Sequence, residues 1–198
     1  KKLSKHTLAA FPTHCLGFRS WWPDGYVLIE DCCEATGAHH EGKKLGTFGL
    51  ASNFSFYYAH HLSTIEGGMV CTNDHDIYQK VRMLRSHGMV RESTDPATRA
   101  AYQAENPELN PDFIFAFPAF NVRNTEIGAI LGRQQLKRLD ENVALRTRNL
   151  KLFLSLIDPS RYRTDFKLEG SSNYAFNLVL KHPDSEAMGR LMDRLHQE

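Results

Sequence analysis

Cysteine is scarce in this 198-residue chain, which contains only Cys15, Cys32, Cys33 and Cys71. No two of them form a C-x-x-C pair, and Cys32 and Cys33 are adjacent. This spacing fits neither a zinc knuckle nor the disulfide framework of a small secreted domain. We therefore expect free thiols, most of them buried.

The sequence also lacks a charge bias and a long apolar run. Its 24 Lys and Arg residues nearly balance 23 Asp and Glu residues, which leaves a net charge of +1. This balance argues against broad electrostatic binding to nucleic acid or to a membrane surface. No apolar run approaches the roughly 20 residues of a membrane-spanning helix, and no signal peptide is visible. We expect a cytoplasmic protein.

Apolar runs predict three strands in the first half of the chain. Residues 26–31 are apolar and end on two acids. Continuous apolar runs of this length are typical of parallel strands that are covered on both faces. Residues 51–58 and 67–72 are the next candidates. The two acids would then lie at the carboxyl end of a strand, where open α/β sheets bind ligands.

Helical periodicity and turn residues predict the remaining elements. Residues 73–88 form a helix that Asn73 or Asp74 caps and Gly88 ends. Residues 92–112 are polar with three prolines, which predicts a long surface loop. Residues 124–157 follow the pattern of one long amphipathic helix. Residues 171–184 predict a strand of a second, smaller unit, with a helix after it.

Three features follow one another along the chain: an acid that closes a strand, a serine in the next strand, and a distinctive residue before a glycine turn. They belong to a set of four segments that form a recognisable pattern. These segments are LIEDCCEATGAHHEGKKLGTFG, FSFYYAHHLSTIEGGMV, LRSHG and FNVRNTEIGAILGRQQLKRLDE. Over most of residues 26–157 the chain resembles the sugar aminotransferases of the DegT/DnrJ/EryC1/StrS family. The resemblance implies an α/β fold of the fold-type-I, aspartate-aminotransferase-like class of pyridoxal-phosphate enzymes.

That fold has a mixed or parallel sheet with helices on both faces, followed by a smaller α+β domain. Residues 1–124 would be part of the large cofactor-binding domain, residues 125–157 a linking helix, and residues 158–198 the start of the small domain. We expect a partial chain, because the family's first phosphate-binding turn is missing. Only eight residues separate Gly17 from the strand at Tyr26, whereas a parallel crossover needs a dozen or more.

The resemblance assigns four residues to a cofactor, pyridoxal or pyridoxamine 5'-phosphate. Asp31 matches the carboxylate that keeps the pyridine nitrogen protonated, so that the ring can withdraw electrons. Glu34 matches a residue near the ring hydroxyl, and Ser55 matches a hydroxyl that holds the phosphate. Asn121 matches an asparagine that reaches the phosphate from the neighbouring subunit, which implies a homodimer with shared active sites. Taken alone, Asp31 and Ser55 would more often be structural. Asn121 could simply lie in the turn before the following helix, where Asn124 competes with it for the cap.

The chain departs from the family at His60, where the usual member has a lysine that links covalently to the cofactor. Imidazole has no primary amine and cannot form that link, but it titrates near neutrality and can move a proton. Lys43 and Lys44 lie in a different loop and cannot substitute. With a histidine at position 60 in place of the family's lysine, and with Glu34, the chain resembles the sugar 3-dehydratase branch of the family.

This branch implies 3-dehydration of a nucleotide-linked 4-keto-6-deoxyhexose, with glutamate restoring pyridoxamine phosphate. One dehydratase type acts on a CDP-linked sugar with an iron–sulfur cluster and a reductase, and needs clustered cysteines. Residues 89–123 contain none, so we favour the type that acts on GDP-4-keto-6-deoxymannose and expect no reductase. The alternatives are a nucleotide-sugar aminotransferase and a degenerate, non-catalytic family member.

Two further residues match positions that face the substrate or the glutamate carboxylate in the cluster-free dehydratase. These are His87 and Arg91, although an exposed arginine and a histidine at a helix end explain them about as well. We expect no metal site. A zinc site from the adjacent pairs His39–His40 and His60–His61 is disfavoured because neighbouring side chains on a strand point in opposite directions. His39, His40 and His61 are expected to be structural or solvated.

Overall fold

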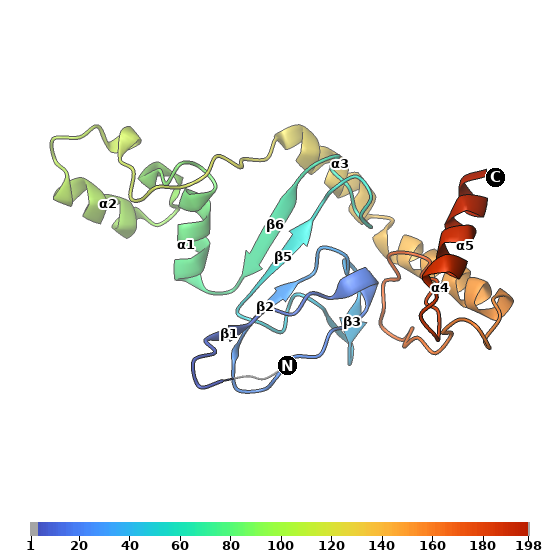
Figure 1. The fold of residues 1–198 in the computed structure, drawn as a ribbon. Helices are drawn as coiled ribbons and strands as arrows, with labels where there is room; N and C mark the ends of the chain where they lie inside the picture. The colour runs from blue at the N-terminus through green and yellow to red at the C-terminus, as the bar shows by residue number, and fades with distance from the viewer. Residues whose placement is uncertain (1–3, 198) are drawn as a thin grey trace.

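The computed structural model describes residues 4–197 and is organised around a four-stranded mixed sheet (Figure 1). The strand order is β1-β2-β5-β6; the first three strands are parallel, and β6 runs antiparallel to β5. These strands are β1 (Ala9–Ala10), β2 (Val27–Asp31), β5 (Ala51–Ser55) and β6 (Gly68–Thr72). A separate two-stranded hairpin consists of β3 (His39–His40) and β4 (Lys43–Lys44).

The strands predicted at 26–31 and 67–72 are confirmed. The strand predicted at 51–58 ends early, at Ser55, because the chain turns and the amide of His60 donates to the carbonyl oxygen of Tyr57. The connection before β2 is not short. It begins at Ala10, contains the 3₁₀ turn η1 (Cys15–Gly17), and is long enough for a parallel crossover.

Helices flank both sides of this sheet (Figure 1). Helices α1 and α2 extend to one side, whereas α4 and α5 lie on the other, beyond α3. The α-helices are α1 (His75–Leu84), α2 (Pro96–Glu105), α3 (Glu126–Leu136), α4 (Leu139–Leu156) and α5 (Ser185–Gln197). The predicted cap of α1 is confirmed, since the Asp74 carboxylate accepts a hydrogen bond from the amide of Ile77. None of the helices in residues 4–197 is long and apolar enough to cross a membrane.

The loop predicted at 92–112 is wrong, because this segment contains α2 and overlaps two 3₁₀ turns at its ends, η2 (Val90–Glu92) and η3 (Pro111–Phe113). Asp95 caps α2 by accepting from the amides of Ala97 and Thr98, and Pro96 occupies its first turn. A proline there suits a helix start, since that amide has no partner inside the helix. Pro96 and Pro111 were therefore helix-start signals, whereas Pro107 lies in the turn between α2 and η3.

The single helix predicted for 124–157 is also wrong, because α3 and α4 are separate helices. The break lies at Arg138, whose φ of −108° and ψ of 1° are not helical. Leu139, the first residue of α4, is buried and packs close to Gly37. Tertiary packing thus redirects the chain in the middle of a continuous apolar pattern.

The strand predicted at 171–184 is wrong as well, whereas the helix after it is confirmed as α5. The only β contact in this region is one isolated bridge between Tyr162 and Leu180. Residues 171–174 instead fold against η1, where Ser172 and Tyr174 donate their amides to the carbonyl oxygens of Gly17 and Leu16. Their backbone groups are satisfied by a loop of the large sheet and not by a neighbouring strand.

Candidate active site

The sequence-predicted residues of β2 and β5 lie on one face of the sheet. Side chains alternate along a strand, and Asp31 pairs in register with Asn53. The Asn53 amide nitrogen donates to Asp31 Oδ1 at 2.9 Å, so these side chains share a face. Ser55, two residues beyond Asn53, projects from that same face. The carboxylate and the hydroxyl predicted to hold a cofactor are therefore placed on the same side of the sheet.

The Asp31 carboxylate is held by three donors. Besides the side chain of Asn53, the amide of Cys33 donates to Oδ1 at 3.2 Å and the hydroxyl of Thr13 donates to Oδ2 at 3.1 Å. Burial opposes ionisation of Asp31, but the hydrogen bonds from Cys33, Asn53 and Thr13 outweigh it and lower its pKa. Asp31 is therefore an ionised carboxylate that can stabilise a nearby proton.

Glu34 lies close to Asp31. Its Oε2 accepts the amide of Leu16 at 2.7 Å. Burial raises the pKa of the Cys15 thiol, and the negative charges of Glu34 and then Asp31 raise it further. Thr13 donates to Asp31 and Leu16 donates to Glu34, so both carboxylates contact the same short segment before β2.

His60 lies in the turn after β5, half-buried between aromatic rings. Its ring centroid lies 5.7 Å from that of Tyr57 and 5.4 Å from that of Tyr174. Its Nδ1 is buried and makes no hydrogen bond to any described residue. Buried polar atoms are normally satisfied, so this nitrogen is a candidate partner for a group that this chain does not supply.

His61 is buried, with 5% of its surface exposed, and its Nε2 lies 2.9 Å from the carbonyl oxygen of Ser172. Burial lowers the pKa of His61 to about 4, and the positive charge of Arg146 adds to the effect. The hydrogen bond to Ser172 acts in the opposite direction but does not compensate. His61 is therefore a neutral, structural histidine, and the solvated alternative is wrong.

The remaining predicted residues lie on a different part of the chain. Asn121 forms a bridge with Ser86 and accepts from the Arg123 side chain, and the His87 amide donates to the carbonyl oxygen of Phe120. Asn121 and His87 are thus neighbours, and both are exposed. Arg91 is exposed and lies over the ring of Phe113. Within residues 4–197, none of the three has a hydrogen bond or ring contact with Asp31, Glu34 or His60.

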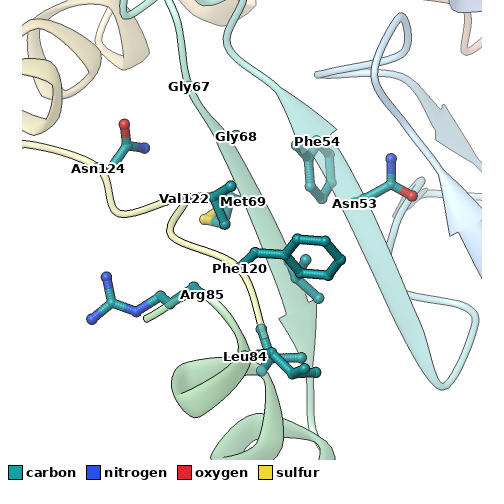
Figure 2. Close-up of a pocket in the computed structure, with 12 residues that line it drawn as sticks. Asn53, Phe54, Gly67, Gly68, Met69, Leu84, Arg85, Phe120, Val122 and Asn124 are labelled. Carbon is teal, nitrogen blue, oxygen red and sulfur yellow. The ribbon is translucent and has the colours of Figure 1, made fainter. Parts of the chain in front are cut away.

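Figure 2 shows a pocket beside β6 that has a volume of about 500 Å³. Its lining is mostly apolar and includes Met69, Leu84, Phe120 and Val122, with Asn53 at one side. Phe120 and Val122 are 70% and 69% exposed. The pocket touches the site only through Asn53, and none of the predicted site residues lines it. It therefore contributes apolar surface and no acid–base group to the candidate site.

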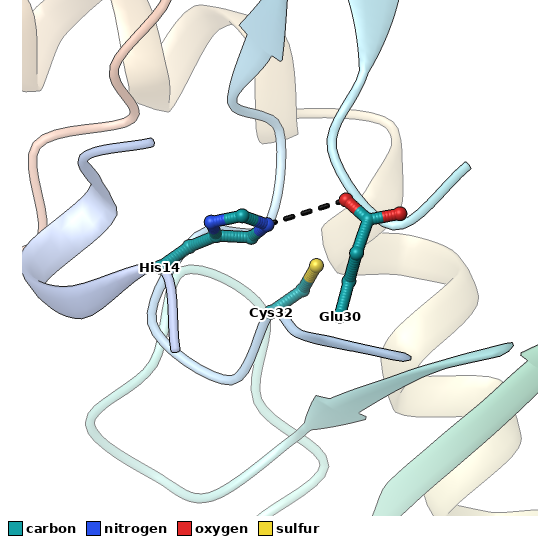
Figure 3. Close-up of side chains that lie close together, drawn as sticks. All are labelled: His14, Glu30 and Cys32. Atoms are coloured by element: carbon teal, nitrogen blue, oxygen red, sulfur yellow. Dashed lines mark hydrogen bonds and ion pairs between the residues drawn. The ribbon is translucent and has the colours of Figure 1, made fainter. Parts of the chain in front are cut away.

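Sequence reasoning missed a buried cluster of His14, Glu30 and Cys32 (Figure 3). This is the only set of three potential metal ligands within 4.8 Å of one another in the part of the chain that the structure describes. The sequence contained a signal for this cluster, because Glu30 is the first of the two acids that end the apolar run of β2. Every member is fully buried.

The Glu30 carboxylate is saturated by donors from the protein itself. Its oxygens accept the amides of Gly46, Phe48 and Gly49 at 2.7–2.9 Å. His14 Nδ1 accepts the amide of Ser20, so its Nε2 carries the proton and donates to Glu30 at 3.2 Å. Four donors occupy the carboxylate, and the cluster acts as a clamp on the loop before β5.

Residues 23–198 match the sequence model of the DegT/DnrJ/EryC1/StrS aminotransferase family. The chain belongs to this family. The chain is 31% identical over 171 residues to a GDP-4-keto-6-deoxy-D-mannose 3-dehydratase of Escherichia coli O55:H7, covering 86% of this chain and 44% of that protein. It is 40% identical over 122 residues to a GDP-perosamine synthase of Caulobacter vibrioides, covering 62% of this chain and 28% of that protein.

A solved structure confirms the fold of this family member. The E. coli GDP-4-keto-6-deoxy-D-mannose-3-dehydratase with bound hydrated PLP superposes with a TM-score of 0.80 at 27% identity. The match covers 98% of this chain and 52% of that one. The predicted fold class, the PLP-dependent aminotransferase fold, is therefore correct. The chain spans about half the length of the relatives that it matches.

The Glu30 clamp predicts a specific pH dependence of stability. Hydrogen bonds from His14 and from the loop amides outweigh burial and lower the pKa of Glu30. Its stabilising effect is therefore complete above the unfolded-state pKa of about 4.3 and is lost as pH falls towards the folded pKa. We expect Glu30→Gln to reduce the free energy of unfolding by about 3 kcal/mol at pH 7.

Urea unfolding of wild type and Glu30→Gln at several pH values between 7 and 3.5 measures this effect. The difference between the two proteins should shrink below about pH 4.3. Glu108→Gln, at an exposed glutamate, is the matched control and should change little at any pH. A Glu30→Gln deficit that stays constant down to pH 3.5 would contradict the assignment of an ionised, clamped Glu30.

Proposed function

We propose that the protein containing this chain catalyses 3-dehydration of a nucleotide-linked 4-keto-6-deoxyhexose, with GDP-4-keto-6-deoxymannose as the favoured substrate. Pyridoxamine 5'-phosphate is the working cofactor, and glutamate restores its amine. The observation that carries the proposal is His60, a half-buried imidazole with an unpartnered nitrogen where the family resemblance predicts a lysine. The chain spans about half the length of its relatives, so the proposal concerns the whole protein.

The residues around β2 fit the cofactor. When bound, pyridoxamine phosphate supplies an amine for the sugar ketone and an electron-withdrawing ring. Asp31 is suited to hold a proton on the ring nitrogen, because three donors keep its carboxylate ionised. Glu34 is assigned to the ring hydroxyl. Ser55, on the same face as Asp31, is assigned to the phosphate. Within residues 4–197 its oxygen has a single long hydrogen bond, accepted from the amide of Tyr57 at 3.3 Å.

His60 is the proposed base. Its Nδ1 has no partner among the described residues and can take up a proton. The imidazole then donates a proton to the 3-hydroxyl of the sugar, which departs as water. Unlike a lysine, a histidine has no primary amine with which to bond to the carbon that carries the cofactor amine and displace it, so that amine would stay available to the substrate.

The exposed residues complete the proposed site between subunits. Asn121 is assigned to the cofactor phosphate of a second copy, which makes the active protein a homodimer with shared sites. Its exposure and its lack of contact with Asp31 and His60 within one chain agree with that role. His87 and Arg91 are assigned to the substrate or the glutamate carboxylate, for which a guanidinium provides two parallel donors.

The proposed domain division follows the same family pattern. Residues 1–124 contribute to the large cofactor-binding domain and residues 158–198 begin the small domain. The linking segment, residues 125–157, consists of α3 and α4. We propose neither an iron–sulfur cluster nor a reductase partner, because residues 89–123 contain no cysteine.

Full-length protein incubated with pyridoxamine phosphate, glutamate and GDP-4-keto-6-deoxymannose should convert the sugar to its 3-deoxy form. Loss of one oxygen atom is balanced by oxidation of glutamate to 2-oxoglutarate with release of ammonia. Mass spectrometry of the sugar and enzymatic assays of ammonia and 2-oxoglutarate measure this turnover. His60→Asn should lower it by about 10² or more, since a general base contributes that much. A 4-amino sugar as the product would overturn the proposal.

The second candidate is a nucleotide-sugar aminotransferase, which the 40% identity to a GDP-perosamine synthase favours. His60→Lys separates the two functions. For a dehydratase we expect the new amine to bind pyridoxal phosphate covalently, to produce an absorbance near the edge of the visible range, and to abolish dehydration. His39→Lys, at an exposed position, is the control and should leave the product unchanged.

Both proteins are assayed for the 3-deoxy and the 4-amino sugar. Amino-sugar formation by wild type, increased in His60→Lys, would establish amino transfer as the native reaction. No spectral change with pyridoxal phosphate in either protein would indicate a non-catalytic family member.

A further inference from the structure

The second histidine of the His60–His61 pair has a single fixed hydrogen bond. A carbonyl oxygen only accepts, so the Nε2 of His61 must carry the proton that it shares with Ser172 at 2.9 Å. His61 is buried, and its Nδ1 has no partner among the described residues. The ring is therefore held in one tautomer and one orientation by a contact 111 residues away in sequence.

The segment that His61 contacts, Ser171–Tyr174, is itself anchored to the large sheet. The hydroxyl of Ser171 and the amide of Ser172 both donate to the carbonyl oxygen of Gly17, at 2.7 and 3.1 Å. Gly17 has a φ of +86°, and an added Cβ would lie 2.6 Å from the amide nitrogen of Asn173. The approach is thus so close that only glycine fits there.

The same segment links two of the proposed site residues. The amide of Tyr174 donates to the carbonyl oxygen of Leu16 at 3.0 Å, and the amide of Leu16 donates to Glu34 at 2.7 Å. The ring of Tyr174 lies 5.4 Å from the ring of His60 and 5.7 Å from that of His61, between centroids. The guanidinium of Arg146 donates to the Tyr174 carbonyl oxygen at 2.8 Å and holds the segment from the α4 side.

We propose that His61 is a positioning residue for His60. Its hydrogen bond to Ser172 fixes the turn that carries both histidines against the Ser171–Tyr174 segment, and the Tyr174 ring then packs against the imidazole of His60. His61 takes part in no proton transfer. The inference rests on the proposed function for its effect on catalysis, but the contact between the His60 and Tyr174 rings can be tested without a cofactor.

Two substitutions separate the hydrogen bond from the packing of the ring. His61→Phe keeps an aromatic side chain and removes the donor, whereas His61→Gln keeps an N–H that can reach Ser172. His182→Phe, at an exposed histidine, is the matched control. Urea unfolding identifies any variant that does not fold, and ring contacts and kinetics are then compared for the folded proteins.

Nuclear Overhauser contacts between the His60 and Tyr174 rings provide the first readout, in the full protein without cofactor. They should persist in wild type, His182→Phe and His61→Gln and weaken in His61→Phe. Amide hydrogen exchange at residues 172–174 should rise about tenfold in His61→Phe alone, because a local anchor has been removed. Unchanged ring contacts and unchanged exchange in His61→Phe would overturn the proposal.

Steady-state kinetics with pyridoxamine phosphate, glutamate and the GDP-linked ketosugar provide the second readout. His61→Phe should lower kcat by about tenfold to a hundredfold with KM within about twofold, since a misplaced base affects the chemical step. His61→Gln should restore most of kcat. A normal kcat in His61→Phe despite lost ring contacts, or no rescue by glutamine, would overturn a positioning role. If the wild-type protein shows the expected ring contacts but no dehydratase turnover, the proposed function is refuted instead.

Discussion

The buried carboxylate of Glu30 is the interaction on which the candidate site depends. An ionised group without access to water is tolerated only when donors surround it, and Glu30 has three loop amides and the ring of His14. These bonds hold the loop before β5 against the end of β2. The relative positions of Asp31 on one strand and Asn53 and Ser55 on the next follow from that attachment.

Because side chains alternate along each strand, neighbouring residues of β2 and β5 point to opposite faces of the sheet and make different contacts. Glu30 and Ser52 face the loop and satisfy its backbone, including the carbonyl oxygen of Gly46, which accepts from the Ser52 hydroxyl. Asp31 and Ser55 face the other way and are free to meet a ligand. Adjacent acids in the sequence thus serve different purposes, one by holding the loop and the other by presenting an ionised carboxylate.

The adjacent residues His60 and His61 also differ in their contacts. Both keep an Nδ1 without a partner among the described residues, but only His61 also has a hydrogen bond to the carbonyl oxygen of Ser172 through its Nε2. Tyr174 lies against both rings, so a segment from the C-terminal part of the chain contacts the turn after β5. The proposed proton-transfer group and its proposed positioning residue are thus adjacent in the sequence.

The sequence by itself determined the parallel strand that ends at Asp31 and the cap of α1 at Asp74. Through family motifs it also predicted that His60 replaces a lysine. These features depend on local patterns, namely an apolar run, a capping side chain and a fixed order of motif residues. The family match agrees with the motifs, while the roles of all the predicted site residues stay predictions, namely those of Asp31, Glu34, Ser55, His60, His87, Arg91 and Asn121. The tertiary structure alone decided the break at Arg138, the absence of the strand predicted at 171–184, and the contacts of Glu30 and His61. Each of these depends on a partner far away in the chain, such as Gly37, Gly17, the loop at Gly46 or Ser172, and local periodicity carries no information about such partners.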